Sequence, residues 1–344
     1  MDNKAGSKSM SRLTFAIPVY ERDSYFEQAL DSALNQTVAA RIVVVDNGSS
    51  HDRFREIVAA KGSARVRFYK NQTNLGMFAN WNLAARYAET EFVMILGDDD
   101  YVLPNYAEEF ERALDAHPDI DAYYTGIRWF SAEPMEFPSY TYPVGYQAGR
   151  TMLEFAAEHG LGIPSTSLCL RRSLFDGRGF LERPHGSSDW LFAYEALNAS
   201  AVFGNPELLA GYRKHPESDT LSGDTAMVTA VSCVYIYWRI GELLDEAGST
   251  FFAKKARRRA RELSINVGIN WGARYETWLA NAPADHLYVQ FLKKVIFPTE
   301  PLARALASPH SYRLLILLIA RIRRKSLFMA QRLRAVMHRA PVSP

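Results

Sequence analysis

Cysteine is scarce in this chain of 344 residues, which contains only Cys169 and Cys233. Two thiols cannot form a framework of several disulfides or a zinc site with four thiolate ligands. Long apolar runs are also missing, because the longest spans residues 314–320 and a membrane-spanning helix needs about 20 residues. Residues 1–11 are polar and contain no apolar segment of the kind that a signal peptide requires. We therefore expect a globular protein without a disulfide scaffold, a spanning helix or a signal peptide.

Acidic residues are missing from the last part of the chain, residues 301–344. This tail contains nine of the 40 basic residues, whereas all 38 acidic residues precede it, so the net charge of +2 combines an acidic body with a basic tail. Such asymmetry predicts a polyanionic partner. Within residues 313–339, leucine, isoleucine and phenylalanine alternate with arginine and lysine at helical spacing, which is typical of a helix in an anionic membrane interface.

The predicted partner of the tail is therefore an anionic membrane surface, and we expect a cytoplasmic protein held peripherally at the inner face of the cytoplasmic membrane. The alternative is a helix that packs against the rest of the chain or a second subunit, with its arginines facing water. Nucleic-acid binding fits less well, because few aromatic residues lie among the basic ones.

Apolar strands and amphipathic helices alternate four times within the first 120 residues. We expect strands at 13–19, 41–45, 66–70 and 91–96, and helices at 23–35, 54–60, 78–88 and 104–117. Short connections between them indicate a parallel, doubly wound α/β sheet. Ligands of such sheets bind beyond the carboxyl ends of the strands, and here a polar cluster follows every strand. The clusters are residues 20–22, 46–49, 74–76 and 98–100.

The pattern changes after about residue 120. We expect further strands at 122–130, 165–171 and 208–215, helices at 152–159 and 189–198, and a helical chain from residue 226. The predicted organisation is a flexible terminus, a two-part catalytic domain and a helical C-terminal region. Their ranges are 1–11, 12–222 (divided into 12–120 and 121–222) and 223–344.

Three consecutive carboxylates, Asp98 to Asp100, follow an apolar strand and repel one another unless cations share their charge. Oxygen ligands at this density suit Mg²⁺ or Mn²⁺ bound together with a diphosphate. The alternative is a solvated turn that caps a helix at Pro104. Asp46 follows another buried strand, where a carboxylate either accepts hydrogen bonds from a base or ribose or caps the next helix.

Four segments of the first half stand in a characteristic order and spacing. They read Ala-Ile-Pro-Val-Tyr-Glu-Arg (16–22), Val-Val-Val-Asp-Asn-Gly-Ser-Ser (43–50), Asn-Leu-Gly (74–76) and Leu-Gly-Asp-Asp-Asp-Tyr-Val-Leu-Pro (96–104). Together they resemble the motifs of glycosyltransferase family 2, a large inverting group with the GT-A fold. The resemblance is strong over residues 12–125 and weaker to about residue 222. It implies a mixed, Rossmann-like sheet flanked by helices, here followed by the helical C-terminal region.

The resemblance implies a site for a nucleotide-sugar donor. Its expected residues are Pro18, Tyr20, Glu21, Asp46, Asn74, Asp98 and Asp99, with Asp46 holding the base and Asp98 approaching the ribose or sugar. Asp100 would bind Mn²⁺ or Mg²⁺. Two positions depart from the family's frequent pattern, since Asn47 stands where a second acidic residue is common and Gly97 opens the metal motif.

The second half is expected to supply the acceptor site and the general base. Inverting transfer needs a carboxylate that deprotonates the acceptor hydroxyl. The segment Ser-Ser-Asp-Trp (187–190) resembles the family's Glu-Asp base motif, with Ser188 in place of the usual Glu. Asp189 is therefore the predicted base, the alternative being an N-cap of the following helix. Trp190 would stack on an acceptor sugar or else pack in the core.

A second segment, Gly211 to Ser222, resembles the family's Tyr-Arg-x-His sequence. His215 would be a metal ligand or a diphosphate contact, and Arg213 would offset nearby negative charge. Arg171 ends a predicted strand near the expected acceptor site, although a solvated basic residue is the alternative reading.

The sequence thus predicts a metal-dependent inverting glycosyltransferase. It would move a sugar from a nucleotide diphosphate to a hydroxyl of a growing glycan, including one carried on a lipid. One alternative is a sugar-nucleotide pyrophosphorylase, although residues 20–22 lack the glycine-rich phosphate loop expected after its first strand. The other alternative is a non-catalytic scaffold that recruits partners through the basic tail.

Overall fold

The computed structural model describes residues 10–131, 142–162, 165–177, 179–182, 187–215, 223–281 and 290–291. The chain divides into two compact units, residues 1–258 and 259–344. The first unit contains the sheet, its flanking helices, all of α7 (Gly223–Glu246) and the first part of α8 (Thr250–Asn281). In the second unit, the described residues belong to the rest of α8 and to a short helical segment at 290–291. The predicted division between residues 222 and 223 does not coincide with this boundary.

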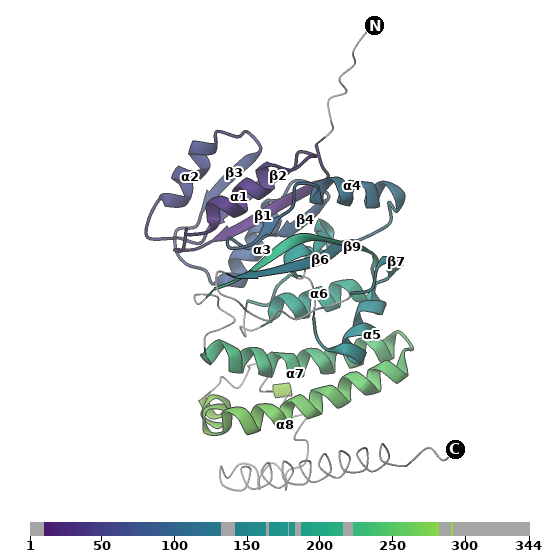
Figure 1. Ribbon diagram of the computed structural model, residues 1–344. Helices are drawn as coiled ribbons and strands as arrows, with labels where there is room; N and C mark the ends of the chain where they lie inside the picture. The colour runs from purple at the N-terminus through teal and green to yellow at the C-terminus, as the bar shows by residue number, and fades with distance from the viewer. Residues whose placement is uncertain are drawn as a thin grey trace, which may run out of the picture. The chain divides into compact units, whose positions relative to one another are not determined.

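Four parallel strands form the first half of the sheet, in the spatial order β3-β2-β1-β4 (Figure 1). They are β1 (Leu13–Val19), β2 (Arg41–Asp46), β3 (Val66–Lys70) and β4 (Phe92–Ile95). Ala16 in β1 lies opposite Val43 of β2 and Ile95 of β4, which fixes the register at the centre of the sheet. The parallel arrangement predicted from the alternating pattern is confirmed for this half.

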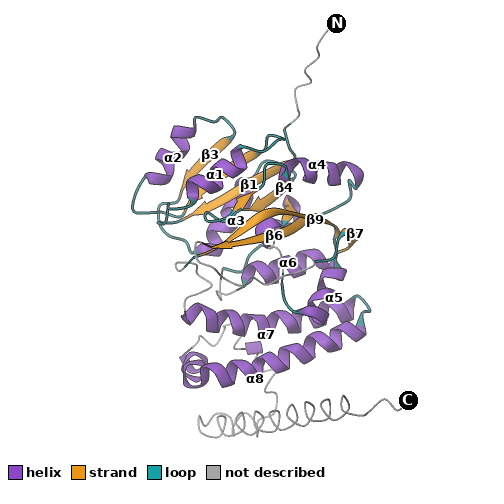
Figure 2. Cartoon of the chain, viewed as in Figure 1, coloured by secondary structure: helices purple, strands orange, loops and turns teal. Residues whose placement is uncertain are grey.

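Successive strand residues point to opposite faces, and each face is covered by its own helices (Figure 2). Phe15 and Ile42 pack with α1 (Phe26–Leu34), α2 (Arg53–Lys61) and α4 (Tyr106–Ala116) in one core cluster. Ala16 and Val43 face the other core cluster, to which the remaining helices of the unit contribute side chains. These are α3 (Met77–Tyr87), α5 (Arg150–His159), α6 (Ser188–Asn198), α7 and α8.

The second half extends the same sheet to nine strands and makes it mixed. The added strands are β5 (Tyr101–Val102), β6 (Ala122–Ser131), β7 (Gly145–Ala148), β8 (Cys169–Arg171) and β9 (Ala201–Lys214). β8 runs antiparallel to both β4 and β6, whereas β6 and β9 are parallel. The predicted mixed α/β sheet with flanking helices is therefore confirmed.

The segment 165–171 differs from the single strand that the sequence predicts. Ser165–Ser167 form a 3-10 turn, η1, and only Cys169–Arg171 pair as a strand before a second turn, η2 (Arg172–Phe175). The hydroxyl of Ser167 donates a hydrogen bond to the Thr125 carbonyl at 2.7 Å, so its polar group is bound within the core. The strands β5 and β7 were not predicted either, because such short segments carry little periodicity. β9 begins at Ala201, seven residues before the predicted strand 208–215.

One helix in the described ranges is long and apolar enough to cross a membrane by length and composition, the 20-residue stretch Met227–Glu246 of α7. Within its most apolar window of 18 residues, 56% of the residues are buried inside the protein. Ile236 and Ile240 pack in the core beneath the sheet, and Arg239 forms an ion pair with Glu195 of α6 at 2.8 Å. This packing favours a core helix. The basic tail, 301–344, lies outside the described residues, so its membrane-binding helix stays a prediction.

We expect Tyr106→Phe to lower the free energy of unfolding by about 1–2 kcal/mol. The buried Tyr106 hydroxyl of α4 donates to the Ser167 carbonyl at 2.7 Å, and its loss leaves that carbonyl without this donor. Urea unfolding measures the change. Tyr146→Phe is the matched control, because the Tyr146 hydroxyl binds Asp119 at the surface and its loss should cost less than about 0.5 kcal/mol. Equal losses in the two variants would contradict the role of Tyr106.

Candidate active site

The carboxyl ends of β1, β2, β3 and β4 meet at one edge of the sheet, as the polar clusters predicted. Side chains from these exits contact one another directly. Glu21 after β1 binds Ser50 after β2, Asn47 after β2 binds Asn74 after β3, and Arg22 binds the acidic triplet after β4. The structure thus joins segments that lie up to about 80 residues apart in the sequence into one polar surface.

The two carboxylate oxygens of Asp46, at the end of β2, have different partners. Its Oδ1 accepts hydrogen bonds from the backbone N–H and the hydroxyl of Ser49, at 2.9 and 2.6 Å. Its Oδ2 accepts no hydrogen bond from the described residues and forms an ion pair with Lys70 Nζ at 3.5 Å. The side chain is only 1% exposed. Because a buried carboxylate oxygen normally accepts a hydrogen bond, Oδ2 is suited to accept one from a ligand.

Glu21 holds the exits of β1 and β2 together. Its backbone has a positive φ of 54°, and its carboxylate accepts hydrogen bonds from the N–H and hydroxyl of Ser50, each at 2.9 Å. These two bonds hold the pKa of Glu21 below its ordinary value. Tyr20 remains 43% exposed beside this clamp, whereas Pro18 is buried in β1 opposite Val45. Of the three predicted donor residues here, Tyr20 presents the most side-chain surface to a ligand.

Asn47, one of the two departures from the family pattern, is nearly buried and organises the loop after β3. Its Nδ2 donates to Asn74 Oδ1 at 2.9 Å and to the Gly76 carbonyl at 3.3 Å. Its Oδ1 accepts from the Leu75 N–H at 3.0 Å. Asn74 Oδ1 also accepts from the Gly76 N–H at 2.8 Å. A side chain with both a donor and an acceptor is required at position 47, and Asn supplies both where Asp would supply only acceptors.

The acidic triplet after β4 is partly neutralised by an arginine from β1's exit. Arg22 Nη2 lies 3.0 Å from Asp98 Oδ1 and 2.9 Å from Asp99 Oδ2. Burial, together with repulsion from Asp99, raises the pKa of Asp98 to about 7. One arginine therefore does not compensate the charge of the triplet.

Asp100 is the most enclosed member of the triplet, at 5% exposure. Its Oδ1 accepts the backbone N–H of Arg213 at 2.9 Å, and its Oδ2 accepts the hydroxyl of Thr166 at 3.1 Å. Burial and the neighbouring charge of Asp99 raise the pKa of Asp100 well above its ordinary value. Both oxygens are thereby held in fixed directions.

The end of β9 reaches the same cluster. Arg213 Nε donates to the Asp99 carbonyl at 2.9 Å, and its guanidinium lies over the rings of Tyr25 and Phe130. His215 is nearly buried, and its Nε2 lies 2.9 Å from Asp99 Oδ2. The structure therefore brings Arg213 and His215 to the acidic triplet.

Gly97, the second departure, stands where the carboxylates are most crowded. A Cβ at this position would lie 2.9 Å from Asp99 Oδ1 and 3.0 Å from Asp100 Oδ2, which is closer than ordinary contact. The absence of a side chain at position 97 thus leaves room for the two carboxylates to point toward the same place.

Asp189 lies in the first turn of α6 and is partly buried. Burial raises the pKa of its carboxyl to about 6. The turn Ser165–Ser167 reaches the acidic triplet through Thr166, whose hydroxyl binds Asp100. Thr166 is a site residue that the sequence prediction missed. The available signal was the polar Ser-Thr-Ser run inside a segment predicted to be a strand.

Two residues predicted to lie at the acceptor site, Trp190 and Arg171, are not brought to the acidic triplet by hydrogen bonds or ion pairs such as those described above. Trp190 packs against the hydrophobic core, which was its alternative reading. Arg171 pairs in register with Phe92, the first residue of β4, and so lies at the other end of this strand from Asp98–Asp100. There it binds Asp121 at 2.9 Å and also pairs with Glu91. Its expected place at the acceptor site is therefore corrected, because ion pairs hold it at the opposite edge.

The residues of the triplet fit a hard divalent cation in their chemistry and charge. Carboxylate oxygens are preferred ligands of Mg²⁺ and Mn²⁺. Burial and the neighbouring charge of Asp99 raise the pKa of Asp98 and of Asp100, and a bound cation would stabilise their charged forms. In the described parts of the chain, no three histidine, cysteine, aspartate or glutamate side chains already have metal-holding geometry. Asp99 Oδ2 is instead engaged by Arg22 and His215.

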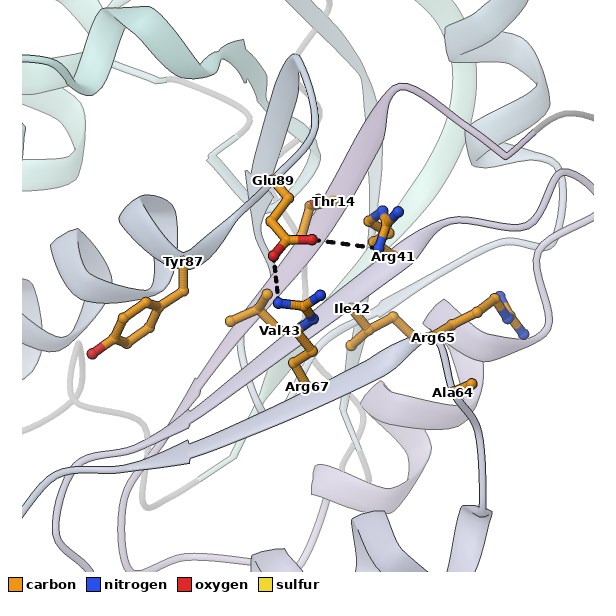
Figure 3. Close-up of a pocket in the computed structure, with 9 residues that line it drawn as sticks. All are labelled: Thr14, Arg41, Ile42, Val43, Ala64, Arg65, Arg67, Tyr87 and Glu89. Carbon is orange, nitrogen blue, oxygen red and sulfur yellow. Dashed lines mark hydrogen bonds and ion pairs between the residues drawn. The ribbon is translucent and has the colours of Figure 1, made fainter.

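A small surface pocket lies away from this cluster, at the amino ends of β1, β2 and β3 (Figure 3). Arg41 and Arg67 converge there on Glu89, which neutralises part of their charge. Because the pocket is at the opposite edge from Asp46 and the acidic triplet, it does not belong to the candidate active site.

Comparison with known proteins identifies the domain that carries this site. Residues 14–177 match the family model "Glycosyl transferase family 2". An uncharacterized glycosyltransferase of Methanocaldococcus jannaschii is 30% identical over 111 residues, which cover 31% of this chain and 38% of that protein. The match therefore spans well under half of the relative's length. This part of the chain is a glycosyl transferase family 2 domain.

Two solved structures resemble the chain over most of its length. S. aureus TarS 1-349, in complex with UDP-GlcNAc, has a TM-score of 0.55 at 18% identity and covers 88% of this chain and 91% of its own. The mannosyltransferase PcManGT from Pyrobaculum calidifontis, in complex with GDP-Man and Mn²⁺, has a TM-score of 0.50 at 14% identity, with coverages of 90% and 87%. These likenesses confirm the GT-A type of fold that the resemblance implied.

We expect Asn47→Asp to destabilise the protein by about 1–3 kcal/mol, measured by urea unfolding. The carboxylate would lose both Nδ2 hydrogen bonds and would face Asn74 Oδ1 and the Gly76 carbonyl with oxygen against oxygen. Asn105→Asp is the matched control. Position 105 is the N-cap of α4, where an acidic side chain is favourable, and the Nδ2 hydrogen bond lost there is a long, exposed one to Glu207 at 3.5 Å. A loss at Asn47→Asp no larger than at Asn105→Asp would contradict the organising role of Asn47.

Proposed function

We propose that this chain, whose residues 14–177 form a glycosyl transferase family 2 domain, is a metal-dependent inverting glycosyltransferase. It transfers a sugar from a nucleotide-diphosphate donor to a hydroxyl of a growing glycan. One observation carries the proposal: the buried Asp46 oxygen that accepts no hydrogen bond from the described residues and the crowded Asp98–Asp100 triplet lie at the same edge of the sheet. A nucleotide diphosphate has a hydrogen-bonding base at one end and a charged group that binds cations at the other.

The base of the donor lies at the exits of β1 and β2 in this proposal. Asp46 Oδ2 accepts a hydrogen bond from an N–H of the base, which gives the buried oxygen the hydrogen-bond donor that it lacks among the described residues. Tyr20 offers its exposed ring to the same ligand. The rigid Glu21–Ser50 clamp and the Asn47–Asn74 loop fix the positions of these two groups before the donor arrives.

The diphosphate lies at the acidic triplet. Asp100 and His215 are the proposed ligands of Mn²⁺ or Mg²⁺, and Asp98 approaches the ribose or sugar. When bound, the cation supplies neutralisation of the negative charge that develops on the leaving diphosphate. The protein's part is to hold the Asp100 oxygens in fixed directions through Arg213 and Thr166. PcManGT, whose structure was solved with GDP-Man and Mn²⁺, supports this assignment by analogy of fold.

Asp189 is the proposed general base. Inverting transfer is a single displacement, so one carboxylate must take the proton of the acceptor hydroxyl as the new glycosidic bond forms and the bond to the diphosphate breaks. A base works best when its pKa lies near the working pH, and burial raises that of Asp189 to about 6.

The basic tail, 301–344, motivates the remaining part of the proposal, an acceptor carried on a lipid at the cytoplasmic face of the membrane. Its amphipathic pattern and lack of acidic residues support binding to anionic lipid. The nucleobase, the sugar and the linkage are left open by the sequence and the fold, since TarS and PcManGT were solved with different donors.

We expect calorimetry to show that the wild-type protein binds UDP or GDP. Its affinity for the nucleotide should be at least about tenfold higher with MnCl₂ than without it. Asp100→Asn should lose this metal-dependent gain, because one ligand oxygen is replaced by an amide. Asp115→Asn is the control, since Asp115 is an exposed residue of α4 that pairs with Arg12 away from the site. The same gain in both variants would exclude Asp100 as a ligand.

Calorimetry also separates the two rival functions. No binding of either nucleotide, with or without metal, would favour a non-catalytic scaffold. Release of pyrophosphate from a nucleoside triphosphate and a sugar 1-phosphate would instead identify a sugar-nucleotide pyrophosphorylase.

We expect Asp189→Asn to reduce transfer by at least about 10²-fold while donor binding is retained, because the amide cannot accept the acceptor's proton. In the wild type, kcat/KM should rise about tenfold per pH unit up to a pH near 6 and then level off. The rate rises with pH because the Asp189 carboxyl is protonated below its pKa and then cannot accept the proton of the acceptor. A panel of nucleotide sugars identifies the donor for this transfer assay. Asp176→Asn is the control, because Asp176 is exposed and its substitution should leave transfer unchanged. Full transfer by Asp189→Asn would overturn its assignment as base.

A further inference from the structure

Arg22 joins the exit of β1 to the acidic triplet through ion pairs that the proposed function leaves without a role. One guanidinium nitrogen, Nη2, lies 3.0 Å from Asp98 Oδ1 and 2.9 Å from Asp99 Oδ2. The side chain of Arg22 is 24% exposed, and those of the two aspartates are 16% and 21% exposed. Solvent therefore reaches this guanidinium, and so can a dissolved ligand.

The turn that carries Arg22 is fixed by contacts on both sides. The Arg22 N–H donates to the Tyr20 carbonyl at 2.6 Å, and Glu21 between them has a φ of 54°, in the left-handed region. The Glu21 N–H donates to the Ser49 hydroxyl at 2.9 Å, while its carboxylate binds Ser50. A residue other than glycine keeps such a φ where its surroundings hold it. The turn therefore directs Glu21 to the exit of β2 and Arg22 to the exit of β4.

We propose that Arg22 binds the diphosphate of the nucleotide-sugar donor, exchanging its contact with Asp98 for phosphate oxygens when the donor arrives. This inference rests on the proposed function, since it takes the diphosphate to lie at the acidic triplet. A guanidinium donates two parallel hydrogen bonds to a phosphate group and stays charged at any working pH. The exchange makes and breaks only ion pairs and hydrogen bonds.

The charges at the triplet give the exchange its physical reason. A diphosphate at this place faces three carboxylates, which repel it unless positive charge lies between them. Arg22 already lies against two of these carboxylates. When its guanidinium turns to the phosphate, Asp98 Oδ1 becomes available to a hydroxyl of the ribose or sugar. Tyr20, the proposed contact of the base, stands two positions before Arg22, so one turn would serve both ends of the nucleotide diphosphate.

Arg213 also reaches the triplet, but it is held in a way that favours a structural role. Its Nε donates to the Asp99 carbonyl at 2.9 Å. The centre of its guanidinium lies 4.2 Å from the ring centre of Tyr25 and 4.4 Å from that of Phe130. Movement toward a ligand would break this stacking as well as the hydrogen bond. Arg22 is therefore the better candidate for an arginine that changes partners.

Calorimetry of the full-length protein tests the proposal by comparing a nucleoside diphosphate with the monophosphate of the same base. UDP and UMP form one pair and GDP and GMP the other, and all are titrated at the same excess of MnCl₂. We expect the wild type to prefer the diphosphate, and Arg22→Ala to reduce the ratio of the two affinities by at least about tenfold, because a charge-assisted contact is lost. Arg22→Lys keeps the charge without the planar fork and should recover part of the ratio.

Arg12→Ala is the matched control. Arg12 precedes β1, at the opposite edge of the sheet, and its Nη2 likewise bridges two carboxylates, Glu111 at 2.7 Å and Asp115 at 2.5 Å. Its loss should leave the affinity ratio unchanged. If Arg22→Ala does not fold, Arg22→Gln keeps a polar side chain without the charge and should lower the ratio in the same way.

An NMR titration follows the exchange directly. In protein labelled with ¹⁵N at arginine, absence of one Nε–H signal in Arg22→Lys assigns Arg22. We expect this signal to shift on addition of the diphosphate and to shift less with the monophosphate.

The outcomes separate this inference from the proposed function. An affinity ratio that stays the same in the folded Arg22 variant would overturn the role of Arg22, whether both affinities fall together or neither does. An equal fall of the ratio in Arg12→Ala would do the same. Failure of the wild type to bind any of the four nucleotides would overturn the proposed function as well. If MnCl₂ has no effect on nucleotide binding, the metal dependence fails, while the affinity ratio still decides the role of Arg22.

Discussion

The crowding of three carboxylates at the end of β4 is the constraint on which the candidate site depends. Burial and mutual repulsion raise the pKa values of Asp98 and Asp100, so the triplet is stable only where donors and cations from other segments face it. Arg22 comes from the exit of β1, while Arg213 and His215 come from the end of β9, more than 100 residues later. Negative charge at one strand end thus accounts for the meeting of segments from both ends of the catalytic domain.

Each departure from the family pattern is matched by its neighbours in the fold. Asn47 donates and accepts hydrogen bonds within the loop that contains Asn74, a combination that an acidic side chain could not provide. Gly97 leaves space into which the carboxylates of Asp99 and Asp100 extend. Two substitutions that look like erosion of a motif in the sequence are therefore compatible with an intact site, because the surrounding atoms complement them.

The contacts of the turn Ser165–Ser167 illustrate why part of the site could not be predicted. Its residues were expected to form a strand, and nothing in their local pattern distinguishes the Thr166 hydroxyl, which binds Asp100, from the Ser167 hydroxyl, which binds a backbone carbonyl. Arg171 shows the reverse error. A basic residue at a predicted strand end was assigned to the acceptor site, but antiparallel pairing of β8 with β4 places it beside Phe92, at the opposite edge.

The sequence by itself determined the four parallel strands, the helices between them and the residues at each strand exit, because apolar periodicity and strand-end chemistry are local properties. It also determined the family of the domain through the order of four motifs. Only the folded structure shows which distant groups meet, such as Thr166 with Asp100 and Arg171 with Asp121. The physical reason is that these contacts depend on strand direction, register and the packing of segments far apart in the chain, none of which leaves a local signal.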